Sequence, residues 1–91
     1  MIEPKIVQVF AKIHEGEAPL KAIRDTLGWS QKKLAERLGV TVTTISRWET
    51  GRNSVTLTIP QIRALDTVLD EVGMRIRDLP DDIGPATKNK Q

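Results

Sequence analysis

Apolar residues recur at steps of three and four along most of the chain, which is the spacing of one buried helix face. A first helix is expected over residues 3–14. A second is expected to begin at Pro19 and to end at Gly28, because proline suits a first helical turn and glycine a left-handed C-cap. The apolar stripes of these two helices are Ile2, Ile6, Val9, Phe10, Ile13, Leu20, Ile23 and Leu27.

Two short helices are expected next, over residues 31–38 and 42–50. Ser30 and Thr41 precede them, and a hydroxyl oxygen in that position accepts a hydrogen bond from a free N–H group of the first turn. A glycine follows each helix and ends it. Their inward-facing positions are Leu34, Ala35, Leu38, Ile45 and Trp48.

The last part of the chain predicts one helix and, after it, a segment that can be either a strand or a short helix. Thr58 and Gln61 have the spacing of a capping box, and the helix that they begin is expected to close at Gly73. Its buried positions are Ile62, Leu65, Val68 and Leu69. Residues 74–79 alternate apolar and charged side chains, which fits a half-buried strand that pairs with its copy across a two-fold axis. A short helix is the equal alternative.

The pattern as a whole predicts an all-α protein in three parts. Residues 1–18 form an extra N-terminal helix and a linker, residues 19–79 the main helical domain, and residues 80–91 a flexible tail with few apolar groups. A chain of 91 residues has room for one core and not for a separate sensor domain.

Composition excludes several kinds of site. Cysteine is absent, and the single histidine, His14, cannot form a metal site alone. The start has no secretory signal, and no apolar stretch approaches the roughly 18 residues of a membrane span. We therefore expect a cytoplasmic protein with no membrane partner, metal or cofactor. Enzymatic activity is not expected, because the chain has no catalytic grouping of histidine, carboxylate and nucleophile and no phosphate loop.

Positive charge is concentrated in one part of the chain. The net charge is only +2, but residues 19–53 carry seven basic and three acidic side chains. A basic segment of this kind fits a surface that meets nucleic-acid phosphates.

The same segment has the features of two helices that cross steeply over a short turn. Such a crossing needs a small residue where the backbones approach, and Ala35 fits it. The turn needs a residue that tolerates positive φ, and Gly39 fits it. The outward positions of the second helix are small or polar, as a helix that enters the DNA major groove requires: Val42, Thr43, Ser46, Arg47 and Thr50.

Over residues 20–69 the sequence resembles the phage-repressor family of helix-turn-helix proteins (Cro and repressor, or Xre). The features that carry the resemblance are Ser30-Gln31, Leu34-Ala35, Gly39-Val40-Thr41, Ile45-Ser46-Arg47-Trp48-Glu49 and Gly51. The resemblance implies a five-helix type of repressor DNA-binding domain that docks its second motif helix in the major groove of double-stranded DNA.

The resemblance also implies roles for individual residues. Base edges would be contacted by Val42, Thr43 and Arg47. Phosphates would be contacted by Gln31, Thr44, Thr50, Arg52 and Asn53. Arg24 and Glu49 would form a structural ion pair. The glutamines that open the second motif helix in the best-known phage members are replaced by Val42 and Thr43, so the operator sequence does not carry over.

Function is therefore expected to be transcription regulation, as a homodimeric repressor on a palindromic operator. The alternating segment at residues 74–79 resembles a short strand in antitoxins of the HipB and HigA kind, which makes an antitoxin with a toxin partner one alternative. A second alternative is a protein-interaction module that keeps the fold without binding DNA.

Overall fold

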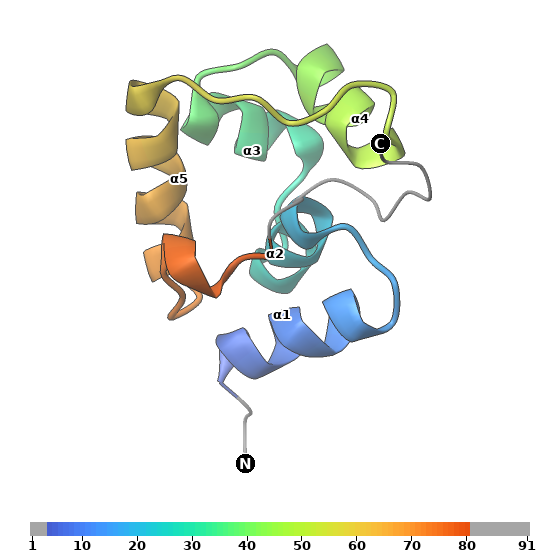
Figure 1. The fold of residues 1–91 in the computed structure, drawn as a ribbon, viewed down its shortest axis with the longest axis vertical. Helices are drawn as coiled ribbons and strands as arrows, with labels where there is room; N and C mark the ends of the chain where they lie inside the picture. The colour runs from blue at the N-terminus through green and yellow to red at the C-terminus, as the bar shows by residue number, and fades with distance from the viewer. Residues whose placement is uncertain (1–3, 81–91) are drawn as a thin grey trace.

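The computed structural model describes residues 4–80. They form the α-helices α1 (Lys5–His14), α2 (Pro19–Leu27), α3 (Gln31–Leu38), α4 (Val42–Thr50) and α5 (Ile59–Asp70), and the 3₁₀ turn η1 (Ile76–Asp78) (Figure 1). No strand occurs in that range, so the predicted all-α class is confirmed. Among these residues no helix combines the length and the apolar character that a bilayer crossing needs.

The helices surround one core. Figure 1 shows α1 at one end of the molecule beside α2, the pair α3 and α4 at the opposite end, and α5 along one side. Every α-helix contributes buried side chains to this core, which consists of Val9, Leu20, Ala22, Ile23, Leu34, Ala35, Leu38, Ile45, Trp48, Leu65, Val68, Leu69, Val72 and Met74. Because α1 supplies Val9 to the same cluster, it packs as part of the domain.

Helices α3 and α4 begin and end at the residues that the sequence predicts. The hydroxyl oxygen of Ser30 accepts a hydrogen bond from the Lys33 N–H group at 3.1 Å, and that of Thr41 accepts one from Thr44 at 3.1 Å. Gly39 and Gly51 end the two helices with φ of 76° and 82°. This left-handed backbone is strained for residues with a Cβ atom, which is why glycine stops the helices there.

The bounds of α1 and α5 differ from the prediction. Helix α1 starts at Lys5, because Pro4 is extended (ψ 147°) and serves as its N-cap without a side-chain hydrogen bond; residue 3 lies outside the described residues. Helix α5 begins with the predicted capping box, Gln61 N–H to Thr58 Oγ1 at 3.3 Å and Thr58 N–H to Gln61 Oε1 at 2.9 Å. It ends at Asp70, and Gly73 lies in the turn that follows.

Ile62 was predicted to be buried in α5, and this is wrong: 36% of its surface is exposed. The buried stripe of α5 is centred on Leu65, Val68 and Leu69, and Ile62 lies at the edge of that stripe one turn from the helix start. At this edge its side chain stays in contact with solvent.

Residues 74–79 take the helical alternative and not the strand. The Asp78 carboxylate accepts a hydrogen bond from the Arg75 N–H group at 2.8 Å, and this contact closes the turn η1. Met74 is buried in the core, whereas Ile76 is exposed. The tail predicted from residue 80 onward lies, apart from Pro80, outside the described residues.

Candidate nucleic-acid interface

Helices α3 and α4 approach closely over the turn that joins them. The N–H groups of Gly39 and Val40 both donate to the carbonyl oxygen of Ala35, at 2.9 and 3.0 Å, and this fixes the exit from α3. The small side chain of Ala35 is buried at the close approach. The side chains of Ile45 and Trp48 are buried in the core, so the side of α4 that carries them packs against the domain and the opposite side faces solvent.

That opposite side lines a shallow, open hollow. Its walls come from the start of α3, the outward face of α4 and the residue after the C-cap of α4: Gln31, Val42, Thr43, Ser46, Arg47, Thr50 and Arg52. The structure thus brings together all the residues expected at base edges and most of those expected at phosphates. Ser46 was left out of the predicted contact set, although its spacing of three or four from Val42, Thr43 and Thr50 places it on the same helix face.

Thr44 and Asn53 do not line this hollow. They belong to a second one, between α4, the loop after it and the start of α5, together with Val40, Trp48, Ser54, Thr56, Leu57, Thr58 and Gln61. Thr44 is four residues from Trp48, so these two side chains lie on the same face of α4, away from the face that lines the first hollow. Its hydroxyl oxygen lies 2.9 Å from that of Thr41, within hydrogen-bond distance.

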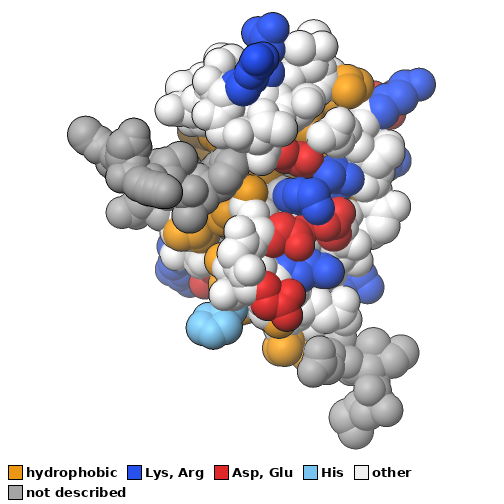
Figure 2. Space-filling view, turned by 90° about the vertical axis from the view of Figure 1, so that its right-hand side faces the viewer, with side chains coloured by type: hydrophobic (Ala, Val, Ile, Leu, Met, Phe, Trp, Pro, Cys, Tyr) orange, Lys and Arg blue, Asp and Glu red, His pale blue; other side chains and the backbone are white. Residues whose placement is uncertain are grey.

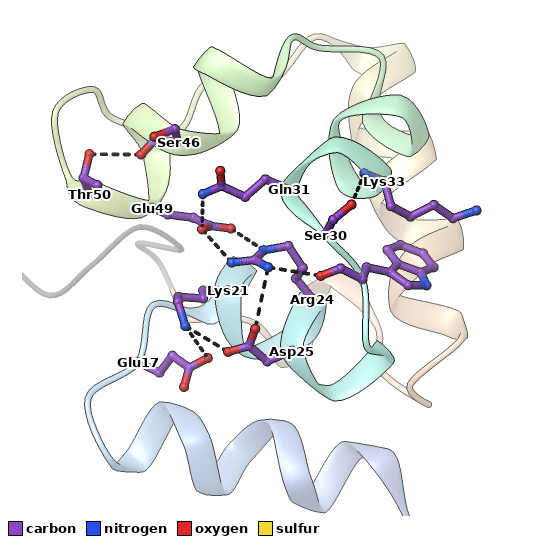
Figure 3. A network of polar contacts seen from close by, with 11 residues as sticks. Glu17, Lys21, Arg24, Asp25, Ser30, Gln31, Lys33, Ser46, Glu49 and Thr50 are labelled. Atoms are coloured by element: carbon purple, nitrogen blue, oxygen red, sulfur yellow. Dashed lines mark hydrogen bonds and ion pairs between the residues drawn. The ribbon is translucent and has the colours of Figure 1, made fainter.

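A charged cluster lies between α2, the start of α3 and the end of α4 (Figure 3). Arg24 forms a two-pronged contact with Glu49: Nε to Oε2 at 2.8 Å and Nη2 to Oε1 at 2.9 Å. Arg24 Nη1 also donates to the Trp29 carbonyl oxygen at 3.0 Å, and Gln31 Nε2 donates to Glu49 Oε1 at 2.9 Å. The hydrogen bond to Glu49 raises the pKa of Arg24 above its ordinary value.

The cluster continues towards the linker between α1 and α2. Lys21 Nζ lies 2.9 Å from Asp25 Oδ2 and 3.7 Å from Glu17 Oε2, so one ammonium group bridges two carboxylates. The neighbouring Asp25 carboxyl group raises the pKa of Glu17, and burial raises it further; the same interaction with Glu17 lowers the pKa of Asp25. Arg24 Nη1 lies 3.7 Å from Asp25 Oδ1, which joins this group to the Glu49 pair.

The two basic side chains that line the hollow, Arg47 and Arg52, are not part of this charged cluster. Figure 2 views the side of the molecule at the right of Figure 1 and shows basic and acidic side chains interleaved over the middle of that face. Arg47 and Arg52 form no ion pair with any residue between 4 and 80, and both are exposed. The hollow therefore offers two uncompensated positive charges beside small polar side chains, which suits a polyanion.

Comparison with known proteins gives one match. A family model described as "Helix-turn-helix" matches residues 20–76, well over half of the chain. No curated protein and no solved structure matches. The matched part runs from α2 to the first residue of η1 and leaves α1 outside.

Proposed function

We propose that the chain, which belongs to the Xre/Cro-type helix-turn-helix family of DNA-binding transcription regulators, represses transcription in the cytoplasm by binding a palindromic operator as a homodimer. The observation that carries the proposal is the hollow on α4, because residues from α3, α4 and the following loop all present their side chains there. Occupying a promoter blocks transcription without any chemical step.

In the proposed complex α4 lies in the major groove. Arg47 donates both arms of its guanidinium to O6 and N7 of a guanine, a contact that discriminates by about 1–3 kcal/mol. Val42 packs against a thymine methyl group, and Thr43 meets a neighbouring base edge. These three are the base contacts, and Ser46 lies between them on the same wall of the hollow.

Phosphate contacts fix the register of α4 in the groove. Gln31 stands at the first position of α3, where the free N–H groups and the helix dipole favour an anion. Thr50 and Arg52 line the same hollow. Thr44 and Asn53 lie in the second hollow, on the other side of α4, and we place them at the phosphates of the opposite groove wall.

We propose a homodimer because one recognition helix contacts few base pairs. One recognition helix reads only about four or five base pairs, and a pair of them on half-sites about 34 Å apart, one helical turn, gives useful specificity. Residues 4–80 contain one recognition helix, so we place the second one on a second copy of the chain.

Selection of bound DNA from a random duplex pool, with the salt concentration varied in the washes, tests this function. We expect a palindromic site with half-sites one helical turn apart. Binding with no enriched site that disappears at moderate salt would reduce the interaction to non-specific charge attraction. No binding at any salt would favour an interaction module that has kept the fold alone.

An antitoxin is the second candidate, and the surface of α1 favours it. Val7 and Phe10 are 44% and 42% exposed, and they lie outside the part that matches the family. Large exposed apolar side chains on an added helix suit a partner protein. Co-expression with the products of neighbouring genes tests this: a toxic product that the chain binds and neutralises supports it, and neighbours without toxicity exclude it.

A further inference from the structure

The Glu49 carboxylate serves two side chains at once. Both of its oxygens accept from Arg24, and Oε1 accepts in addition from Gln31 Nε2 at 2.9 Å. Its side chain is 4% exposed, and that of Arg24 is 12% exposed. A buried carboxylate that accepts two hydrogen bonds from one guanidinium has little freedom to move. Glu49 is therefore a rigid acceptor for the hydrogen bond from Gln31 (Figure 3).

This contact determines how the Gln31 amide is oriented. A carboxylate only accepts hydrogen bonds, so Gln31 must turn its NH₂ group, and not its carbonyl oxygen, towards Glu49. The NH₂ group has two N–H donors, and Glu49 takes one. The second donor stays available at the hollow, of which Gln31 forms one wall. A glutamine without this contact would rotate freely and would lose that freedom when it bound DNA.

We propose that Glu49, anchored by Arg24, is a positioning residue for DNA recognition: it fixes the Gln31 amide so that the second N–H donates to a DNA phosphate. The inference rests on the proposed function and adds a role for the Arg24–Glu49 pair beyond stability. The negative charge of Glu49 does not repel the phosphate strongly, because the Arg24 guanidinium compensates it at 2.8 Å.

Glu49→Asp is the variant that tests the role, because it keeps the charge and withdraws the carboxylate by one methylene group. The flexible guanidinium of Arg24 can follow the shorter side chain, whereas Gln31 stays in place on α3. Operator affinity is measured over a series of salt concentrations for the wild type, Gln31→Ala, Glu49→Asp and the double variant. Glu36→Asp is the matched control, since Glu36 is exposed and has no ion pair among residues 4–80.

Each single variant is expected to weaken operator binding by roughly three- to tenfold, the effect of one lost hydrogen bond. The double variant should bind no more weakly than Gln31→Ala, because Glu49 acts through Gln31. The slope of affinity against salt should stay that of the wild type, since no basic side chain has been removed. Additive losses in the double variant, or wild-type affinity of Glu49→Asp, overturn the inference.

A second measurement keeps the test independent of folding defects. The side-chain NH₂ signals of Gln31 in nuclear magnetic resonance should show a rigid amide in the wild-type protein and a mobile one in Glu49→Asp, at a temperature where both are folded. A mobile Gln31 amide in the wild type overturns the inference even if DNA binding is normal. A wild type that selects no DNA site overturns the proposed function and this inference together.

Discussion

Helices α3 and α4 each begin at a hydroxyl side chain that caps an N–H group and end at a glycine with positive φ, whereas α1 begins after Pro4 with no side-chain cap and ends at Glu15 in a right-handed conformation. The two regions also differ in burial. Of the large apolar side chains of α4, Ile45 and Trp48 lie in the core and only Val42 is exposed. Helix α1 buries Val9 and leaves two large apolar side chains exposed.

The ends of α3 and α4 are thus fixed by side-chain caps and glycine residues, whereas α1 has no side-chain cap at its start and no glycine at its end. The helix-turn-helix pair must present its side chains at set positions before DNA arrives, and caps, glycine stops and the core contacts of α4 all serve that end. Helix α1 packs on α2 and leaves Val7 and Phe10 exposed.

Loss of a core contact of α4 should have the largest effect. Ile45 is fully buried, so Ile45→Ala should lower the free energy of unfolding by about 2–5 kcal/mol. Val7→Ala on the exposed face of α1 should change it by less than about 0.5 kcal/mol. Urea denaturation followed by circular dichroism measures both; equal losses would mean that the outer face of α1 is as important to the fold as α4.

Loss of the Arg47 guanidinium should be the next largest effect, and it should appear in DNA binding and not in folding. Arg47→Ala should weaken operator binding at least about tenfold and relax the preference at one base pair of each half-site. Arg63→Ala removes the same charge from an exposed position on α5 and is the matched control. If both variants lose affinity equally for every sequence, Arg47 contributes only general charge.

Loss of a helix cap should have a smaller effect. Thr41→Ala removes the oxygen that accepts from the Thr44 N–H group and should lower the free energy of unfolding by about 1 kcal/mol. Thr43→Ala is the matched control. Thr43 is exposed within α4 and is not the N-cap of that helix, so this change should not lower the free energy of unfolding. A Thr41→Ala protein as stable as the wild type would show that the local caps of α4 are not needed.

The smallest effect is expected at the linker between α1 and α2, and it depends on pH. The pKa of Glu17 is raised in the folded protein by the neighbouring Asp25 carboxyl group and by burial, so ionisation of Glu17 lowers stability as the pH rises past the ordinary glutamate pKa of 4.5. Glu17→Gln should therefore gain stability relative to the wild type as the pH increases above that value. Urea denaturation at a series of pH values measures it, and parallel curves would contradict it.

The sequence predicted α3 and α4 better than it predicted α5 and η1. The bounds of α3 and α4 were correct because their signals, Ser30, Thr41 and two glycines, act within three or four residues of the helix ends. Ile62 was wrongly placed in the core because its exposure depends on which distant residues face the start of α5. The turn η1 follows from a hydrogen bond between the Asp78 side chain and the Arg75 backbone, which the alternation of residues 74–79 does not reveal.

The candidate interface shows the same limit. Helical spacing predicted which residues of α4 face outward, and only the structure shows that Thr44 and Asn53 lie in a separate hollow. The contact between Gln31 and Glu49 joins residues 18 positions apart, and neither residue has a local pattern that predicts it.

The separation between the hollow and the charged cluster beneath it has a consequence for engineering. Four residues of α4 have no side-chain hydrogen bond to the rest of residues 4–80: Val42, Thr43, Ser46 and Arg47. By contrast, Arg24 and Gln31 both donate hydrogen bonds to Glu49. Sequence preference should therefore be reprogrammable by randomising the first four positions while the other three are left untouched. The protein would then serve as a scaffold in which the outward residues of α4 are exchanged and the hydrogen bonds to Glu49 are kept.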